Sequence, residues 1–120
     1  MGGVFENRLI EFANVVLLVC ENIKRTEIGN HLRSQLIRSG TSTALNYGEA
    51  QSAESKKDQH HKLSVILKEL RETYINMKLI KLNHLCKDEA LLEKVLDENN
   101  QLIAIFVKSI QTVRKKLNLK

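Results

Sequence analysis

Apolar residues recur at helical spacing over most of this chain, and they predict four long helices. In the first, from about Val4 to Lys24, the apolar positions alternate spacings of four and three residues, which places them on one face. A second apolar line lies beside the first, so the apolar sector is wider than one helix–helix contact needs. The two lines are formed by Phe5, Leu9, Phe12, Val16, Val19 and Ile23, and by Ile10, Ala13, Leu17 and Cys20.

The second predicted helix begins near Glu27 and contains a stretch, Gln35–Ala50, that is rich in small and hydroxyl-bearing residues. A glycine in the middle of a helix costs about 1 kcal/mol relative to alanine. We still predict a helix through Gly40, because small residues let a neighbouring backbone approach closely and the apolar pattern resumes after them. We expect this helix to fray within Gly48–Ser52.

The third predicted helix starts after Ser55, a suitable N-cap with Asp58 three residues later, and runs to about Leu85. One side of this helix changes character along its length. At 100° per residue, basic residues of its first half lie almost directly above apolar residues of its second half. These residues are Lys57, His61 and Lys68, followed by Ile75, Leu79, Leu82 and Cys86.

The fourth predicted helix opens at Asp88 and extends to about Leu117, with a heptad-like apolar seam that one polar residue, Asn99, interrupts. Asn99 either fixes the register of the helix packing or is a tolerated polar residue near an end of the bundle. Four long helices with short links predict an all-α fold, an antiparallel up-down four-helix bundle that forms one domain over residues 1–120.

The surplus apolar faces favour assembly of the bundle into a homo-oligomer. Helix 1 and the second half of helix 3 carry more apolar surface than a lone bundle buries, although a broad core would also explain it. The candidate oligomer interface consists of Ile75, Leu79, Leu82 and Cys86.

Charge is spread unevenly along the chain. The 120 residues are 42% hydrophobic and 28% charged, which is typical of a folded soluble protein. The formal net charge is +5, with −1 in residues 1–55 and +6 in residues 56–120. A basic second half permits contact with nucleic acid, although a solvated lysine-rich surface explains it equally well. The candidate nucleic-acid-binding residues flank the link between helices 2 and 3: Arg33, Arg38, Lys56, Lys57, Lys62 and Lys68.

No residue pattern predicts catalysis, a cofactor or a metal site. The segment around Gly40 lacks the second glycine and the lysine of a phosphate-binding loop. The nearby serines and threonines have no neighbouring base to activate them. Polar residues of the second helix are either a small site or, as we favour, a structural polar motif that hydrogen-bonds inside the bundle. That motif consists of Gln35, Ser42, Asn46 and Glu49.

The start of the chain resembles neither a signal peptide nor a membrane span, because charged residues interrupt the apolar run. We therefore expect a cytoplasmic protein without membrane contact. The two cysteines, Cys20 and Cys86, lie on apolar stripes and form no CxxC motif, so we expect buried free thiols.

The stretch around Gln35–Ala50 also resembles the signature of a bacterial four-helix-bundle family. The resemblance lies in Gln35, Leu36, Arg38, Ser39, Ser42, Asn46, Glu49, Ala50, Ser55, Lys57 and Asp58. The family includes proteins encoded in intervening sequences of large-subunit ribosomal RNA genes, and it is similar to the accessory variability determinant of diversity-generating retroelements. Departures from the usual pattern occur at Thr43, Tyr47 and Ala50.

The resemblance implies a homopentamer, a basic surface that binds RNA or DNA, and a reverse transcriptase as a partner in the retroelement branch. Two functional hypotheses follow. The first is a non-enzymatic oligomeric bundle that binds nucleic acid through its basic surface. The alternative is a structural or protein-partner adaptor that makes no contact with nucleic acid.

Overall fold

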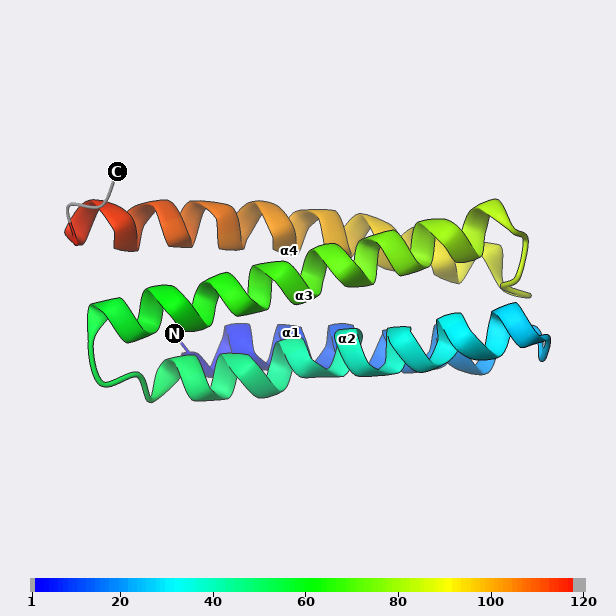
Figure 1. Ribbon diagram of the computed structural model, residues 1–120, viewed down its shortest axis with the longest axis horizontal. Coiled ribbons are helices and arrows are strands. Elements are labelled where there is room, and N and C mark those ends of the chain that lie inside the picture. Colours follow the sequence, from blue (N-terminus) through cyan, green and yellow to red (C-terminus); the bar gives the residue numbers. More distant parts are fainter. Residues whose placement is uncertain (1, 118–120) are drawn as a thin grey trace.

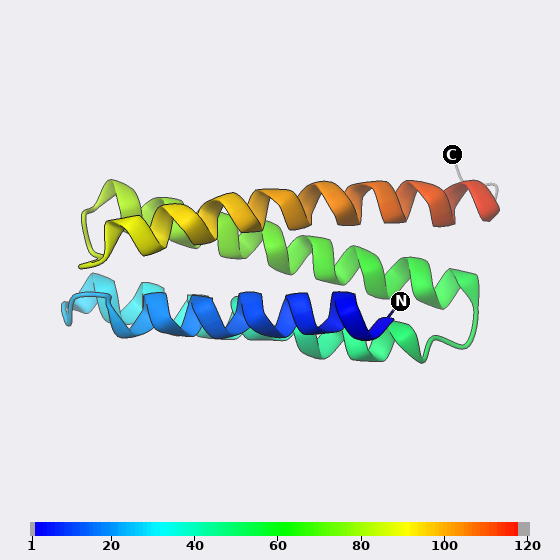
Figure 2. The same cartoon turned by 180° about the vertical axis from the view of Figure 1, so that it is seen from behind.

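The computed structural model describes residues 2–117 as four α-helices without a β-strand among them. Each helix runs antiparallel to the one before it, so that α2 packs on α1, α3 on α2 and α4 on α3 (Figures 1 and 2). Of the four pairs of adjacent helices, the first and fourth make the smallest contact. The helices are α1 (Gly2–Glu21), α2 (Glu27–Gln51), α3 (Lys56–Leu82) and α4 (Glu89–Lys116).

Three side chains cap the N-termini of α2, α3 and α4. Ser55 accepts a hydrogen bond from the backbone N–H of Asp58, and Asp88 accepts one from that of Leu91. Thr26 caps α2 in the same way. The second helix stays helical to Gln51, so its end lies inside the segment where fraying was predicted.

Two helices end earlier than predicted, because the loops that follow them pair with each other. The first helix ends at Glu21 rather than Lys24, and the third ends at Leu82 rather than Leu85. The backbone N–H of Lys24 donates to the carbonyl of Leu85 at 2.8 Å, and a second backbone bond of 2.8 Å runs back from Lys87 to Asn22. These two bonds join the α1–α2 loop to the α3–α4 loop at one end of the bundle.

The predicted apolar seams form the core. Among the largest fully buried side chains are Leu9, Leu36, Ile66, Leu70 and Phe106. The second apolar line of α1 divides: Ala13 and Cys20 are buried, whereas Ile10 and Leu17 reach the surface.

One polar residue of the α4 seam is fully buried. The side-chain amide of Asn99 donates to the backbone carbonyl of Leu70 at 3.1 Å and so ties α4 to α3. Arg8 joins α1 to α4, since its guanidinium donates two hydrogen bonds of 2.8 Å to Glu98. This fork–fork geometry is the strongest arrangement for an arginine and a carboxylate.

Candidate nucleic-acid interface

Arg33 is a buried capping residue rather than a surface cation, since it is only 9% exposed. Its Nε donates to the carbonyl oxygen of Cys20 at 3.1 Å, and its Nη2 donates to that of Ile23 at 2.7 Å. Nη2 also lies 3.3 Å from the carbonyl oxygen of Lys24, and Nη1 donates to Asn30 Oδ1 at 2.7 Å. These bonds satisfy carbonyl groups that the end of α1 leaves without helical partners. The prediction that Arg33 contacts nucleic acid is therefore wrong.

Two further predicted cations are accessible but already paired with carboxylates. Arg38 lies 3.4 Å from a carboxylate oxygen of Glu69 and 3.5 Å from one of Glu72, and its side chain is 56% exposed. Lys62 lies 3.5 Å from Asp58, one helical turn earlier. The carboxylates of Glu72 and Asp58 are partly exposed, and ion pairs of that kind contribute at most about 1 kcal/mol. The carboxylate of Glu69 is largely buried.

The other three predicted cations, Lys56, Lys57 and Lys68, are exposed on α3. Within residues 2–117, no salt bridge joins them to a carboxylate. Lys56 and Lys57 lie in the first turn of α3, and Lys68 lies near its middle. The predicted set thus divides into one buried arginine, two paired cations and three open lysines.

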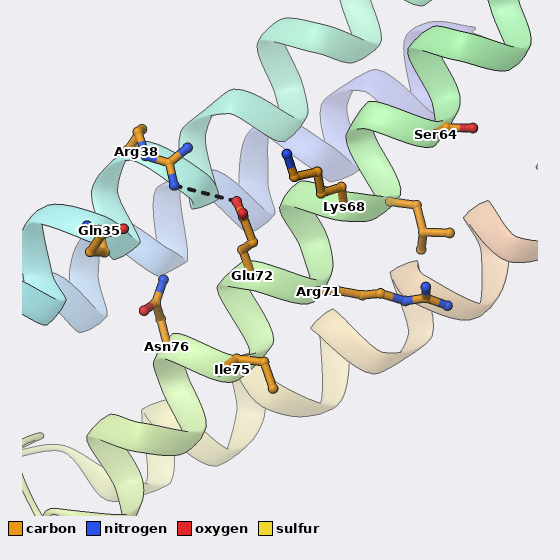
Figure 3. A pocket seen from close by; sticks show the side chains of 9 residues that line it. Gln35, Arg38, Ser64, Lys68, Arg71, Glu72, Ile75 and Asn76 are labelled. Atoms are coloured by element: carbon orange, nitrogen blue, oxygen red, sulfur yellow. Dashed lines mark hydrogen bonds and ion pairs between the residues drawn. The ribbon is translucent and has the colours of Figure 1, made fainter.

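An open groove of about 490 Å³ runs along the outer surface between α2 and α3, and we call it the α2–α3 groove. Arg38 and Lys68 lie on either side of Glu72 there, while Arg71 points the other way, toward α4 (Figure 3). Among the described residues, three cations and one carboxylate line this groove, and the carboxylate of Glu69 lies 3.4 Å from Arg38, which leaves a small net positive charge. Its uncharged lining consists of Gln35, Ser64, Leu67, Ile75 and Asn76.

Arg71 belongs to this site and was missed by the sequence analysis. It is exposed and lies three residues after Lys68, so both project from neighbouring positions on the helix surface. Helical spacing from Lys68 was the signal that would have identified it.

The predicted structural polar motif is only partly internal. Ser42 Oγ donates to a carboxylate oxygen of Glu69 at 2.7 Å and so links α2 to α3. Gln35 lines the α2–α3 groove instead of the core. Glu49 is exposed, and the prediction that it fastens the bundle from inside is wrong. Asn46 is half-buried and makes no side-chain hydrogen bond to another described residue.

Three of the four predicted interface residues form an exposed apolar patch on α3. Ile75 is 57% exposed, Leu79 is 41% exposed and Leu82 is 70% exposed. Cys86 is 6% exposed and does not belong to this surface. The prediction placed Cys86 by extending α3, but the helix ends at Leu82 and the following loop turns inward to pair with the α1–α2 loop.

The buried groups of the bundle are unreactive in character. Cys20 and Cys86 are both buried and free, and burial raises the pKa of the Cys20 thiol to about 11. Nowhere in residues 2–117 do three His, Cys, Asp or Glu side chains gather as a metal site would require. None of the helices described is apolar enough over sufficient length to cross a membrane.

Comparison with known proteins places the chain in a family. A sequence model of 23S rRNA-intervening sequence proteins matches residues 6–108, which is most of the chain. The chain belongs to this family. No curated protein matches the sequence.

A solved structure supports the fold of this family member. A protein of unknown function from the S23 ribosomal protein family of Bacteroides thetaiotaomicron VPI-5482 superposes with a TM-score of 0.78. The match covers 92% of this chain and 97% of that one, at 23% sequence identity. At this identity the likeness concerns the fold alone.

Proposed function

We propose that this protein is a non-enzymatic helical bundle that binds RNA or DNA by its phosphates along the α2–α3 groove. The observation that carries the proposal is the excess of cations there, with Arg38, Lys68 and Arg71 against the carboxylates of Glu72 and Glu69. The family takes its name from an intervening sequence of 23S rRNA. RNA is for that reason the first ligand to test.

The proposed contacts need only point charges and an accessible surface. Lysine and arginine side chains bind phosphate oxygens and release condensed counterions, which makes the affinity fall as salt rises. The groove carries no helix end or strand shaped to enter a nucleic-acid groove and read base edges. We therefore expect binding with little sequence preference.

A fluorescence anisotropy titration with a labelled duplex RNA at low and moderate salt tests the proposal. For Z phosphate contacts the logarithm of the affinity falls with a slope of about −0.9Z against the logarithm of salt for B-form DNA. With about three groove cations engaged, raising salt fourfold is expected to weaken binding by roughly 40-fold. Absence of binding at low salt, or binding that does not change with salt, would refute the proposal.

A matched pair of charge-reversal variants locates the contact. Lys68→Glu with Arg71→Glu alters the groove, whereas Lys87→Glu with Lys94→Glu makes the same change in net charge at exposed positions elsewhere. We expect the first pair to lose most of the binding and the second to lose little. Equal losses would mean that the net charge of the protein, and not the groove, attracts the nucleic acid.

The exposed patch of Ile75, Leu79 and Leu82 favours a second role, assembly with copies of this chain or with a protein partner. The family resemblance makes a homopentamer the first expectation and a reverse transcriptase one such partner. Leu82→Glu should then lower the mass measured by light scattering, while Leu45→Glu, at a position equally exposed (70%), should not. A wild-type mass equal to one chain, 13.7 kDa, would contradict self-assembly.

A further inference from the structure

A second cleft lies at the end of the bundle where α2 ends, α3 begins and α4 ends, on the left of Figure 1. It has a volume of about 440 Å³, within the range of roughly 300–1,000 Å³ that is usual for small-ligand sites. All four helices contribute to its lining, which combines aromatic rings with lysines. We call it the end cleft, and the proposed function does not use it.

Three aromatic rings from distant parts of the chain meet at the end cleft. The ring centroids of Phe5 and Tyr47 lie 5.3 Å apart, edge to face, and that of Phe106 lies 5.6 Å from Phe5 and 6.2 Å from Tyr47. Phe106 is buried beneath the other two, which are half-buried and line the cleft. The chain contains only five aromatic residues, Phe, Tyr and Trp together, and three of them are gathered here.

The rim of the end cleft is basic. Lys56 from the first turn of α3 and Lys116 from the last turn of α4 both line it, and within residues 2–117 no carboxylate does, although Glu54 lines an adjoining hollow. The end cleft adjoins a surface hollow, with Thr112 lining both, and Lys108 and Lys115 line that hollow without a carboxylate. A polyanion that entered the end cleft would therefore find further cations along α4 as it left.

Aromatic rings beside cations are the combination by which proteins hold single-stranded nucleic acid. Bases stack on aromatic side chains, and lysines follow the phosphates between them. A duplex offers its phosphates to the lysines, but its paired bases stay stacked inside and cannot reach the rings. An apolar ligand without charge would use the rings and leave the lysines unpaired.

We propose that the end cleft binds an unpaired nucleotide of a single-stranded nucleic acid, with its base against Phe5 and Tyr47 and its phosphates at Lys56 and Lys116. This inference rests on the proposed function, since it assumes that nucleic acid is the ligand. It adds a division of labour: the α2–α3 groove holds phosphates of either form, and the end cleft distinguishes unpaired from paired strands.

The test compares a labelled single-stranded RNA, a blunt duplex of the same length and an inorganic polyphosphate of similar charge. Tyr47→Leu removes a ring, Lys56→Gln with Lys116→Gln removes the two cleft cations, and Lys68→Gln with Arg71→Gln is the control in the α2–α3 groove. We expect Tyr47→Leu to weaken binding of the single strand at least fivefold, because one stacking contact with a base is lost. Its affinities for the duplex and for the polyphosphate should equal those of wild-type.

Each result separates the two proposals. If wild-type protein binds none of the three ligands, the proposed function fails and this inference fails with it. If wild-type binds but the end-cleft variants bind the single strand as tightly as wild-type, only this inference fails. If Tyr47→Leu weakens binding of polyphosphate as much as binding of the single strand, the inference about the end cleft also fails, because polyphosphate has no base to stack. Tyr47→Phe, which keeps the ring, should bind like wild-type. If Tyr47→Leu does not fold, Lys56→Gln with Lys116→Gln decides, since it changes two exposed cations of the end cleft and should weaken binding of the single strand.

Discussion

The helix α2 contacts α1 and α3 through different kinds of interaction, although both contacts use small residues of the stretch Gln35–Ala50. Toward α1, α2 presents Gly40 and the buried guanidinium of Arg33. Toward α3, it presents the hydroxyl groups of Ser39 and Ser42. The first contact depends on close approach and on satisfied carbonyls, whereas the second depends on hydrogen bonds between side chains. The difference indicates that α2 packs closely against α1 on one side and is hydrogen-bonded to α3 on the other.

Close approach explains the glycine in the α1–α2 contact. A Cβ atom added at Gly40 would lie 2.6 Å from Cγ1 of Val16, which is fully buried and has no room to turn. A Cβ at Gly29 would overlap the carbonyl oxygen of Lys24. Helix propensity alone favours alanine at both positions, so close approach of α1 at Gly40 and of the α1–α2 loop at Gly29 explains why glycine is suited to them.

A chain of hydroxyl groups explains the α2–α3 contact. Thr73 and Ser39 are both fully buried, with their hydroxyl oxygens 3.0 Å apart. Thr73 donates its single proton to the carbonyl of Glu69 at 2.8 Å, so Ser39 must donate to Thr73. The carboxylate of Glu69 in turn accepts from Ser42. Every hydroxyl in this row has a partner, as burial requires.

The largest loss of stability is expected from Arg33→Met, which changes only the contact between α2 and the end of α1. The variant removes the guanidinium donor from the carbonyl groups of Cys20 and Ile23, and the Cys20 carbonyl keeps only the long bond of 3.3 Å from the backbone N–H of Ile23. Hydrogen bonds to charged groups are worth about 1.5–3 kcal/mol each, so we expect a loss of roughly 3 kcal/mol or more. Urea unfolding followed by circular dichroism measures it.

Arg38→Met is the matched control for that experiment. Its ion pairs with Glu69 and Glu72 are long, and its own side chain is 56% exposed, while the largely buried carboxylate of Glu69 keeps a hydrogen bond from Ser42. The same substitution there should cost about 1 kcal/mol. Equal losses for the two arginines would contradict the capping role of Arg33.

The next largest effect is expected when glycines of α2 are replaced by alanine, and the change in stability should have opposite signs at Gly40 and Gly48. Gly40→Ala forces Val16 aside, and overpacking of this kind costs about 1–3 kcal/mol. At Gly48 the nearest atom to an added Cβ is a carboxylate oxygen of Glu6 at 3.9 Å, so Gly48→Ala should stabilise by up to about 1 kcal/mol. Thermal melting of both variants beside wild-type is sufficient. If Gly40→Ala also stabilises, the contact between α1 and α2 is not as close as described.

A smaller effect is expected on the α3 side. Thr73→Val keeps the shape of the side chain but leaves the buried hydroxyl of Ser39 without its acceptor, at a cost of about 1 kcal/mol. Combining it with Ser39→Ala should cost less than the two single changes added together, because both remove the same bond. Thr112→Val, at an exposed hydroxyl, should change stability by less than about 0.5 kcal/mol. Strict additivity of the first pair would show that the two hydroxyls do not interact.

Periodicity was sufficient to predict the helices because each carries a long seam and a recognisable start. Ser55 and Asp88 mark two of these starts as expected. The ends were harder to predict, since backbone pairing between two loops stops α1 and α3 and no local pattern reports it. For that reason Cys86 was assigned to the candidate oligomer interface.

The candidate site was predicted less well, because counting charges ignores which way a side chain points. Arg33 lies three residues before Leu36 and seven before Gly40, on the buried stripe of α2, and that spacing could have identified it. The aromatic cluster had no such signal. Phe5, Tyr47 and Phe106 are far apart in sequence, and only the packing of three helices brings their rings together.

The smallest effect is expected on the reactivity of the Cys20 thiol and not on stability. It distinguishes the α1–α2 contact from the α2–α3 contact. Burial raises the pKa of Cys20 from 9.0 to about 11, so at pH 8 the folded protein should react with a thiol reagent far more slowly than the unfolded chain. Its rate should keep rising up to about pH 11. Because folding raises this pKa, the associated stability is complete below about pH 9 and is lost as the pH rises toward 11.

The measurement uses a Cys86→Ser background, which leaves Cys20 as the one thiol in the chain. Cys20 lies in the α1–α2 contact, where its carbonyl accepts from Arg33. Gly40→Ala should therefore speed its labelling, while Thr73→Val should not, since it loosens only the opposite side of α2. Equal acceleration by both variants would mean that the two contacts open together as a single cooperative unit.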